Sequence, residues 1–213
     1  MNNTEMFKQM VDSQDELNKL TIGEKWRYES YGDKPMDWDK AIRIELAEYE
    51  NSFDWKWWKS GNDNIANAKM ELIDVLHFSI SRSLTDTIKA DLVESLSESY
   101  DERFKGFYNT SDLYENSENF YHKLFGLFDK HNMDIEGIYR LYMQKNLLNI
   151  FRQKNGYAEG TYDKVFTSYH NNITYEGEDN EILVACSIGL EPLEGIKVFT
   201  DIYNKRKEND ENL

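Results

Sequence analysis

The sequence predicts an all-α fold, and three of its features point that way. Apolar residues recur at spacings of three and four along several stretches, the pattern of helices that bury one face. The 213 residues contain only two prolines, so long segments are free to be helical. No segment shows a convincing alternation of period two, which a half-buried strand would need. We therefore expect an all-α fold.

Three helices are predicted in the first part of the chain, at about residues 5–20, 37–53 and 62–80. Gly23 offers a stop for the first helix, and Asp37 can cap the second after a Gly/Asp/Pro loop at residues 31–35. Asn62 or Asp63 can start the third. The apolar stripe of this third helix is continuous and consists of Ile65, Ala68, Leu72, Val75, Leu76 and Ile80.

Five further helices are predicted, at about residues 88–100, 117–130, 134–153, 180–188 and 193–205. Residues from about 85 to 119 are polar and weakly periodic, and a mobile connection is expected after the helix at residues 88–100. Residues 155–179 hold three glycines among many Asn, Asp and Tyr residues, which favours a loop that could order around a ligand over a strand pair. The polar tail from about residue 206 is not expected to pack, and residues 1–213 are expected to form one domain.

The charge balance excludes some classes of partner. The 40 acidic side chains outnumber Lys and Arg and give a formal net charge of −15, which argues against nucleic-acid binding, because that depends on clustered cations. Such acidity is compatible with a metal site, although solubility alone explains most of the carboxylates. No stretch approaches the ~18–20 apolar residues that span a bilayer. Together with a single cysteine, Cys186, these features predict a soluble protein of the reducing cytoplasm.

Four carboxylates stand out by their position. Glu45 and Glu48 lie three residues apart in the second predicted helix, and Glu71 and Asp74 lie three apart in the third, so each pair shares one helix face beside an apolar stripe. Packing the stripes together would bring four negative charges close to one another. Their repulsion must then be reduced by bound cations or by raised pKa values, which leave some of the carboxyl groups protonated. Hard divalent cations such as Mg²⁺ suit oxygen ligands and share their shell with phosphate. Taken singly, either pair could be ordinary surface charge.

Two ordered blocks of the sequence carry more specific information. One runs Glu45-x-x-Glu48, then SFDWKWWK at residues 52–59, then Glu71-x-x-Asp74 with His77 and Phe78. The other is KNLLNIFRQKNGYAEGTYDK at residues 145–164, and QDELN at residues 14–18 adds to both. Together they resemble the dimeric dUTPases of the all-α nucleotide pyrophosphohydrolase superfamily, over about residues 6–164. The carboxylate pairs are shared with the whole superfamily, whereas the second block narrows the resemblance to dUTPases.

The resemblance implies an all-α NTP pyrophosphohydrolase-like fold with a four-helix metal-binding core. It implies Mg²⁺-dependent hydrolysis of dUTP to dUMP and pyrophosphate, an activity that keeps uracil out of DNA and supplies dUMP for dTMP synthesis. Mn²⁺ is a candidate substitute for Mg²⁺, and dUDP and dCTP are candidate further substrates. A homodimer is implied as well, with no nucleic acid or membrane as a partner.

The same resemblance assigns roles to particular residues. Glu45, Glu48, Glu71 and Asp74 would hold Mg²⁺, and Glu45 and Glu48 would be catalytic, with Glu48 the base that orients the attacking water. Twelve side chains would bind the substrate, namely Gln14, Asn18, Trp57, Lys59, His77, Phe78, Lys145, Asn149, Arg152, Asn155, Tyr157 and Lys164. The amides of Gln14 and Asn18 suit the uracil edge or the sugar, whereas Lys145, Arg152 and Lys164 offer positive charge to the phosphates.

Several alternatives stay open at this point. The tryptophans of residues 52–59 could be core or dimer contacts, with one of the three touching nucleotide. His77 could bond to a metal ligand or serve the core, and Arg152 and Lys164 could be surface cations. The activity could extend to dCTP or to a broader house-cleaning range, since a flipped Asn or Gln reads uracil or cytosine. A non-catalytic helical interaction protein with an acidic face is the alternative from another class.

Overall fold

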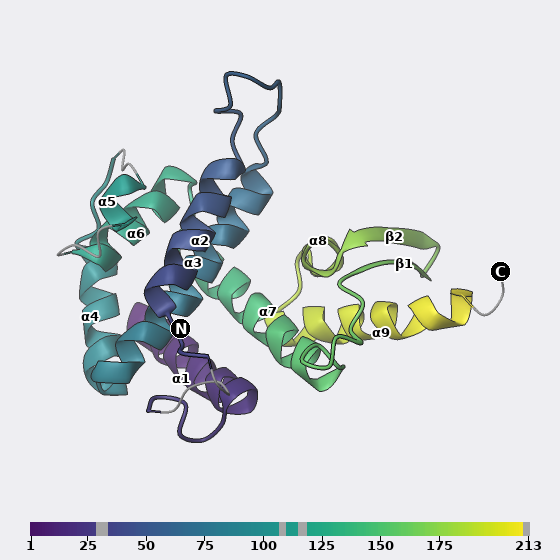
Figure 1. Ribbon diagram of the computed structural model, residues 1–213, viewed down its shortest axis with the longest axis horizontal. Helices are drawn as coiled ribbons and strands as arrows, with labels where there is room; N and C mark the ends of the chain where they lie inside the picture. Colours follow the sequence, from purple (N-terminus) through teal and green to yellow (C-terminus); the bar gives the residue numbers. More distant parts are fainter. Residues whose placement is uncertain (29–33, 107–109, 115–118, 211–213) are drawn as a thin grey trace. The chain divides into compact units, whose positions relative to one another are not determined.

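The structure is a computed structural model that describes residues 1–28, 34–106, 110–114 and 119–210. In that part of the chain helices dominate and one antiparallel strand pair is present (Figure 1), which confirms the all-α class. The helices are α1 (Asn3–Ile22), α2 (Trp38–Asn51), α3 (Ile65–Asp86), α4 (Lys89–Asp101), α5 (Ser111–Tyr114), α6 (Phe120–Lys130), α7 (Ile135–Lys154), α8 (Asp179–Cys186) and α9 (Pro192–Asp210). The strands are β1 (Val165–His170) and β2 (Ile173–Glu178).

The chain divides into two compact units, Met1–Tyr142 and Met143–Leu213, and the boundary falls within α7. Each unit has its own buried apolar residues. That the two form a single domain stays a prediction of the sequence. In the described ranges no helix combines the length and the apolar content needed to cross a membrane.

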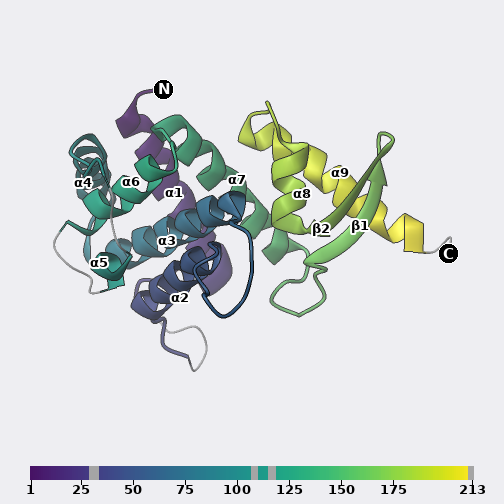
Figure 2. The same ribbon diagram turned by 90° about the horizontal axis from the view of Figure 1, so that it is seen from above.

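The first unit is organised around α2 and α3, which lie side by side and run in opposite directions (Figures 1 and 2). Leu46 of α2 and Leu72 and Leu76 of α3 are fully buried, as the predicted apolar stripe requires. α1 packs against α3 and α4, and its Phe7 meets Phe125 of α6 edge to face at 5.5 Å. Each such buried side chain contributes roughly 1.5–3 kcal/mol, so packing rather than helix propensity holds this unit together.

Local signals set the helix ends close to where the sequence predicts them. Asn2 and Glu5 form a reciprocal capping box at the start of α1, and Gly23 ends that helix at a φ of 127°. The side chain of Asp37 accepts a backbone N–H in the first turn of α2 and so caps it. Asn64 caps α3 in the same way, directly after the predicted start at residues 62–63.

Two predicted features lie partly outside the described residues. Residues 31–33 of the predicted Gly/Asp/Pro loop are outside, and so are residues 117 and 118, where a helix was expected to begin. The described helix there, α6, begins at Phe120. The short helix α5 was not predicted, because four residues are too few to show a helical period.

In the second unit, the prediction of a loop over residues 155–179 is wrong for its latter half. β1 and β2 pair antiparallel along their whole length. Asn171 and Asn172 connect them at positive φ values of 51° and 64°, the type I′ geometry that suits a two-residue hairpin. Asn-Asn between two runs rich in β-branched and aromatic residues is the signal that the glycine content masked.

α9 packs along β1, and α8 lies beside α9 (Figure 1). Phe166 of β1 and Tyr203 of α9 belong to the buried cluster of this unit. α9 continues to Asp210, past the predicted end at residue 205. Arg206 is buried, donates to Asp163 at 2.9 Å and covers the ring of Tyr203 at 3.3 Å. The expectation that packing stops at about residue 206 is therefore wrong for Arg206, because its guanidinium has both a carboxylate and an aromatic face to bind.

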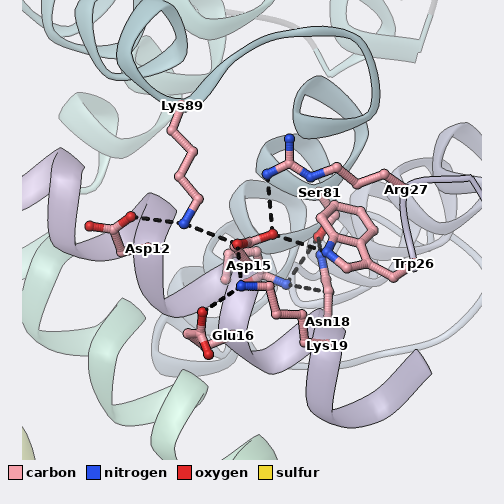
Figure 3. Close-up of polar contacts among 10 residues, drawn as sticks. Asp12, Asp15, Glu16, Asn18, Lys19, Trp26, Arg27, Ser81 and Lys89 are labelled. Carbon is pink, nitrogen blue, oxygen red and sulfur yellow. Dashed lines mark hydrogen bonds and ion pairs between the residues drawn. The ribbon is translucent and has the colours of Figure 1, made fainter. Parts of the chain in front are cut away.

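One buried carboxylate joins three segments of the first unit (Figure 3). The side chain of Asp15 on α1 is 5% exposed. It takes four donors at 3.0–3.2 Å, namely Lys19, Trp26, Arg27 and Lys89. Burial alone raises the pKa of Asp15, but the four donors outweigh it and hold the pKa well below its usual range. The carboxylate thus fastens the turn after α1 and the first residue of α4 to α1.

Replacing Asp15 with Asn should lower the free energy of unfolding at neutral pH by about 3–5 kcal/mol, the usual cost of removing one partner of a buried ion pair. Because the folded-state pKa of Asp15 is depressed, its contribution is fully present above the unfolded pKa of about 3.9 and is lost as the pH falls below it. The gap between variant and wild type should therefore narrow below about pH 4. Urea unfolding across this pH range measures the gap, with Glu94→Gln on exposed α4 surface as control. A gap that does not change with pH would contradict the assignment.

Candidate functional site

Three carboxylates meet between α2 and α3. One ligand oxygen from each of Glu45, Glu71 and Asp74 lies within 4.8 Å of the other two. Their spacing of three residues puts Glu71 and Asp74 on one face of α3, and the packing of α2 against α3 brings Glu45 to that face. The two helices thus bring together three of the four carboxylates that the sequence singles out.

The ionisation of Glu45 is affected by its neighbours. Burial and the charges of its three acidic neighbours raise the pKa of Glu45 to about 8, and a hydrogen bond with Glu71 adds to the shift. At pH 7 Glu45 therefore holds a proton while the cluster carries no cation. A divalent cation would displace that proton, because its charge offsets the repulsion among the carboxylates.

Glu48 lies outside this group of three. It is exposed, yet its charge contributes to the raised pKa of Glu45. Glu45 is half-buried whereas Glu48 is exposed, so the edge of the contact with α3 passes between these two residues of α2. The expected cluster of four is therefore three carboxylates with the fourth on the solvent side.

The donor set of the cluster suits a hard divalent cation. It consists of carboxylates alone, from two packed helices. Mg²⁺ and Mn²⁺ prefer such oxygen ligands, whereas Zn²⁺ and Cu⁺ favour nitrogen and sulfur. The residues present therefore fit a magnesium-like ion.

The two amide residues predicted to meet the nucleoside are buried in a polar network. Gln14 and Asn18 expose 3% and 5% of their surface and bond to each other at 3.0 Å. Both donate to the hydroxyl of Ser81 on α3, and Tyr142 donates to Gln14 at 2.9 Å. Sequence reasoning missed Ser81 and Tyr142 because neither stands in a motif. The position of Ser81, four residues after His77 on one face of α3, was the available signal.

His77 and Phe78 have different surroundings. His77 is buried, donates from Nδ1 to a backbone carbonyl one turn back at 2.9 Å, and stacks on Tyr142 with ring centroids 3.9 Å apart. These contacts favour the core role for His77 over a bond to a metal ligand. Phe78 is half-buried and lies 6.2 Å from Trp38, whose ring meets Trp26 at the same distance. Phe78 is thus one end of an aromatic row beside the start of α2.

The connection between α2 and α3, residues 52–64, extends beyond the ends of the two helices (Figure 1). Trp57 exposes 89% of its surface, Trp55 51% and Trp58 58%. The rings of Trp55 and Trp57 each meet that of Trp58 edge to face at 5.4 Å. The core alternative is therefore wrong for these tryptophans. Lys59 is exposed on the same connection.

In the second unit, Arg152 is committed to a buried ion pair. Its Nε and Nη2 donate to the two oxygens of Asp179 at 2.8 and 2.7 Å, and the side chain of Asp179 is fully buried. Nη1 donates to Asn149 at 3.0 Å, and the Tyr162 hydroxyl donates to Asp179 at 2.8 Å. The surface alternative is wrong for Arg152. The guanidinium also does not present the fork that would grip phosphate oxygens, because Asp179 already occupies it.

The other residues of the second block differ in exposure. Lys145 is buried, whereas Lys164 is exposed and pairs with Glu178 at 3.3 Å. Asn155 donates to a backbone carbonyl at 2.8 Å, within its own turn. Tyr157 is 46% exposed, and the guanidinium of Arg152 lies over its ring at 5.8 Å.

Comparison with known proteins places the chain at the level of a family. A protein-family model described as dUTPase matches residues 6–157, more than half of the chain. The matched range contains the carboxylates, the amide network and Arg152, and it ends before β1. No curated protein matches the chain.

Glu45→Gln should stabilise the cation-free protein, by on the order of 1 kcal/mol at about pH 8, and weaken its response to Mg²⁺. The folded-state pKa of Glu45 is raised, so ionisation costs stability as the pH rises from the unfolded pKa of about 4.3 to the folded value of about 8. The gain of the variant over wild type should therefore grow across that range and then level off. Thermal unfolding in EDTA and in excess MgCl₂ measures both effects. An undiminished Mg²⁺ response in the variant would remove Glu45 from the ion site.

Arg152→Met should lower the free energy of unfolding by about 3–5 kcal/mol, because it leaves the buried Asp179 carboxylate without its cation. The double variant Arg152→Met with Asp179→Asn should recover part of that loss, since the second change removes the stranded charge. Urea unfolding of the two single variants and the double variant measures the coupling. If the losses of the two single variants add up to the loss of the double variant, the ion pair does not carry the stability. A loss of activity in the single variant is thus not by itself a sign of phosphate contact.

Proposed function

We propose a catalytic site for this chain, which belongs to the dUTPase family and accordingly hydrolyses dUTP to dUMP and pyrophosphate. Members of the family use a divalent metal ion. We assign that ion to Glu45, Glu71 and Asp74. The observation that carries the assignment is the approach of their ligand oxygens to within 4.8 Å of one another, at a partly buried contact between two helices.

We infer that the ion is Mg²⁺, with Mn²⁺ as a substitute. Both take carboxylate oxygens and keep positions open for water and phosphate oxygens. The raised pKa of Glu45 supports the inference, because a protonated carboxyl beside two further carboxylates is the state that a cation converts into a ligand set. When bound, the ion neutralises phosphate charge and lowers the pKa of water.

Glu48 is our candidate for the general base. It is exposed and so reaches solvent water, and it lies close enough to the group of three for its charge to act on Glu45. As the water oxygen bonds to phosphorus, the phosphoanhydride bond that joins dUMP to pyrophosphate breaks, and a carboxylate in this position can accept the proton that the water loses. The three remaining carboxylates are then left to hold the ion. Glu45 would be both a ligand of the ion and a catalytic residue, since it has to lose its proton when the ion binds.

The base and sugar are assigned to the side of α3 where Gln14 and Asn18 lie. Ser81, which bonds both amides, follows Asp74 by seven residues, which is two turns and about 10 Å along the helix axis. A nucleoside with its first phosphate spans a similar length, so one helix could present the ion at one end and the amides at the other. Phe78 lies between Asp74 and Ser81 in sequence and is half-buried, and it would supply an apolar surface for the ring of the base. His77 would support this surface from the core.

The substrate-binding roles of the second unit remain proposals. Lys145 and Lys164 would supply positive charge to phosphate, and Asn155 and Tyr157 would supply hydrogen bonds. Arg152 would act by holding Asn149 in place, which its 3.0 Å bond to that amide supports. Lys59 and Trp57, exposed on the connection of residues 52–64, would bind phosphate and nucleotide or contact a second copy.

A homodimer and a reducing, cytoplasmic location stay predictions of the sequence. The exposed tryptophans of residues 52–64 support an interface between copies, because large apolar side chains gathered on a surface are typical of such contacts. The non-catalytic alternative is wrong, since the chain is a dUTP diphosphatase. Use of dUDP or dCTP remains a question of specificity within that activity. Hydrolysis of dUTP, dUDP, dCTP, dTTP and UTP over a magnesium titration tests substrate and cofactor together.

Glu48→Gln should lower kcat by about 100-fold or more, the usual contribution of a general base. Because Glu48 stands outside the group of three, the variant should keep most of the thermal stabilisation by MgCl₂. Steady-state kinetics with dUTP and thermal unfolding measure the two effects, with Glu98→Gln on exposed α4 surface as control. A kcat within a few-fold of wild type would refute the base. A lost Mg²⁺ response would instead make Glu48 a ligand.

A further inference from the structure

The network around Gln14 and Asn18 has one member at which both amides converge. Ser81 is fully buried on α3, and its Oγ lies 3.0 Å from Nε2 of Gln14 and 2.9 Å from Nδ2 of Asn18 (Figure 3 shows Asn18 and Ser81). The same Oγ lies 3.0 Å from the backbone carbonyl oxygen of His77. One hydroxyl thus meets two side-chain amides and one backbone acceptor.

The direction of each bond follows from proton counting. The His77 carbonyl can only accept, so Ser81 donates its single proton there. The Ser81 oxygen is then left as an acceptor, and each amide must turn its NH₂ group toward it. With NH₂ fixed, the Asn18 oxygen accepts from Gln14, and the Gln14 oxygen accepts the proton of Tyr142. The hydrogen bond from Ser81 to the backbone of α3 therefore determines the orientation of both amides.

We propose that Ser81 is a positioning residue for base selection, which holds the amides of Gln14 and Asn18 in the orientation that favours uracil over cytosine. The proposal rests on the assignment of these two amides to the base under the proposed function. In this proposal Ser81 does not contact the substrate. Its hydroxyl prevents the two amide groups from adopting the flipped orientation.

A fixed amide discriminates because uracil and cytosine differ by reversal of their hydrogen-bonding groups. Among the described contacts, Asn18 uses one N–H and one lone pair, so its second N–H and second lone pair can meet a base. Uracil offers a donor at N3 beside an acceptor at O4. Cytosine offers an acceptor at N3 beside a donor at N4, so in the same pose acceptor would face acceptor and donor would face donor. An amide free to flip would satisfy either base, whereas a fixed one rejects cytosine.

The test compares Ser81→Ala with Ser79→Ala. Ser79 is equally buried on the same helix, and its hydroxyl donates to the backbone carbonyl of Leu76 at 3.1 Å rather than to the amides. The readout is the ratio of kcat/KM for dUTP to kcat/KM for dCTP. We expect Ser81→Ala to lower this ratio by about 10-fold or more, through a loss of dUTP turnover and a gain of dCTP turnover. Without the hydroxyl the amides can flip, and a flipped amide forms the hydrogen bonds to cytosine that the fixed amide cannot form. Ser79→Ala should keep the wild-type ratio.

A purely structural role for Ser81 would lower both values together and leave the ratio unchanged, and that result overturns the proposal. A wild-type ratio near one overturns it as well. If Ser81→Ala does not fold, Ser81→Cys keeps the volume with a weaker acceptor and should lower the ratio in the same direction; an unchanged ratio there also overturns it.

Asn18→Ala separates this failure from failure of the underlying assignment. If Asn18→Ala lowers the ratio and Ser81→Ala does not, the amide reads the base and only the role of Ser81 is wrong. If neither variant changes the ratio, the base does not meet these amides, and the assignment under the proposed function is wrong too.

Discussion

The site depends on an opposition between apolar packing and charge repulsion along the contact of α2 with α3. Leu46, Leu72 and Leu76 are fully buried at the core of this unit, and each contributes roughly 1.5–3 kcal/mol toward keeping the helices together. The same unit gathers Glu45, Glu71 and Asp74 where their charges repel. Packing exceeds the repulsion, so the carboxylates stay together and one of them keeps a proton. A divalent cation bound among these carboxylates would remove a repulsion whose cost folding has already incurred.

Rigidity is the second requirement, since the proposed ion site and the proposed base site must keep a fixed separation. α3 carries Asp74, Phe78 and Ser81 on one continuous helix, so backbone hydrogen bonds set the distances among them. α1 carries Gln14 directly beside Asp15, whose four donors tie that helix to the turn after it and to α4 (Figure 3). A charge buried and fully paired in this way contributes to a unique arrangement of its neighbours, and the amides are such neighbours.

The second unit contains a motif residue whose partner the sequence did not predict. The resemblance gave Arg152 to phosphate, yet its guanidinium holds Asp179 with two hydrogen bonds, and Asn149 with a third. Asp179 lies 27 residues away in sequence, on α8. Sequence spacing could not reveal that the first residue of a later helix would meet this arginine. The hairpin at Asn171 and Asn172 could have been recognised. Asn tolerates the positive φ values of a type I′ turn, and the segments on either side are rich in β-branched and aromatic residues.

The sequence by itself determined the all-α class, the ends of the main helices and the pairing of carboxylates at three-residue spacing, because period, caps and helix geometry are local properties. It also determined the family, since residue identities in two ordered blocks carry that information. Only the tertiary structure decided that Glu48 stands apart from the other three carboxylates, that the tryptophans of residues 52–64 are exposed, and that Gln14 and Asn18 converge on Ser81. Each of these depends on which helix packs against which and at what rotation, and helical periodicity leaves that rotation undefined until two apolar faces meet.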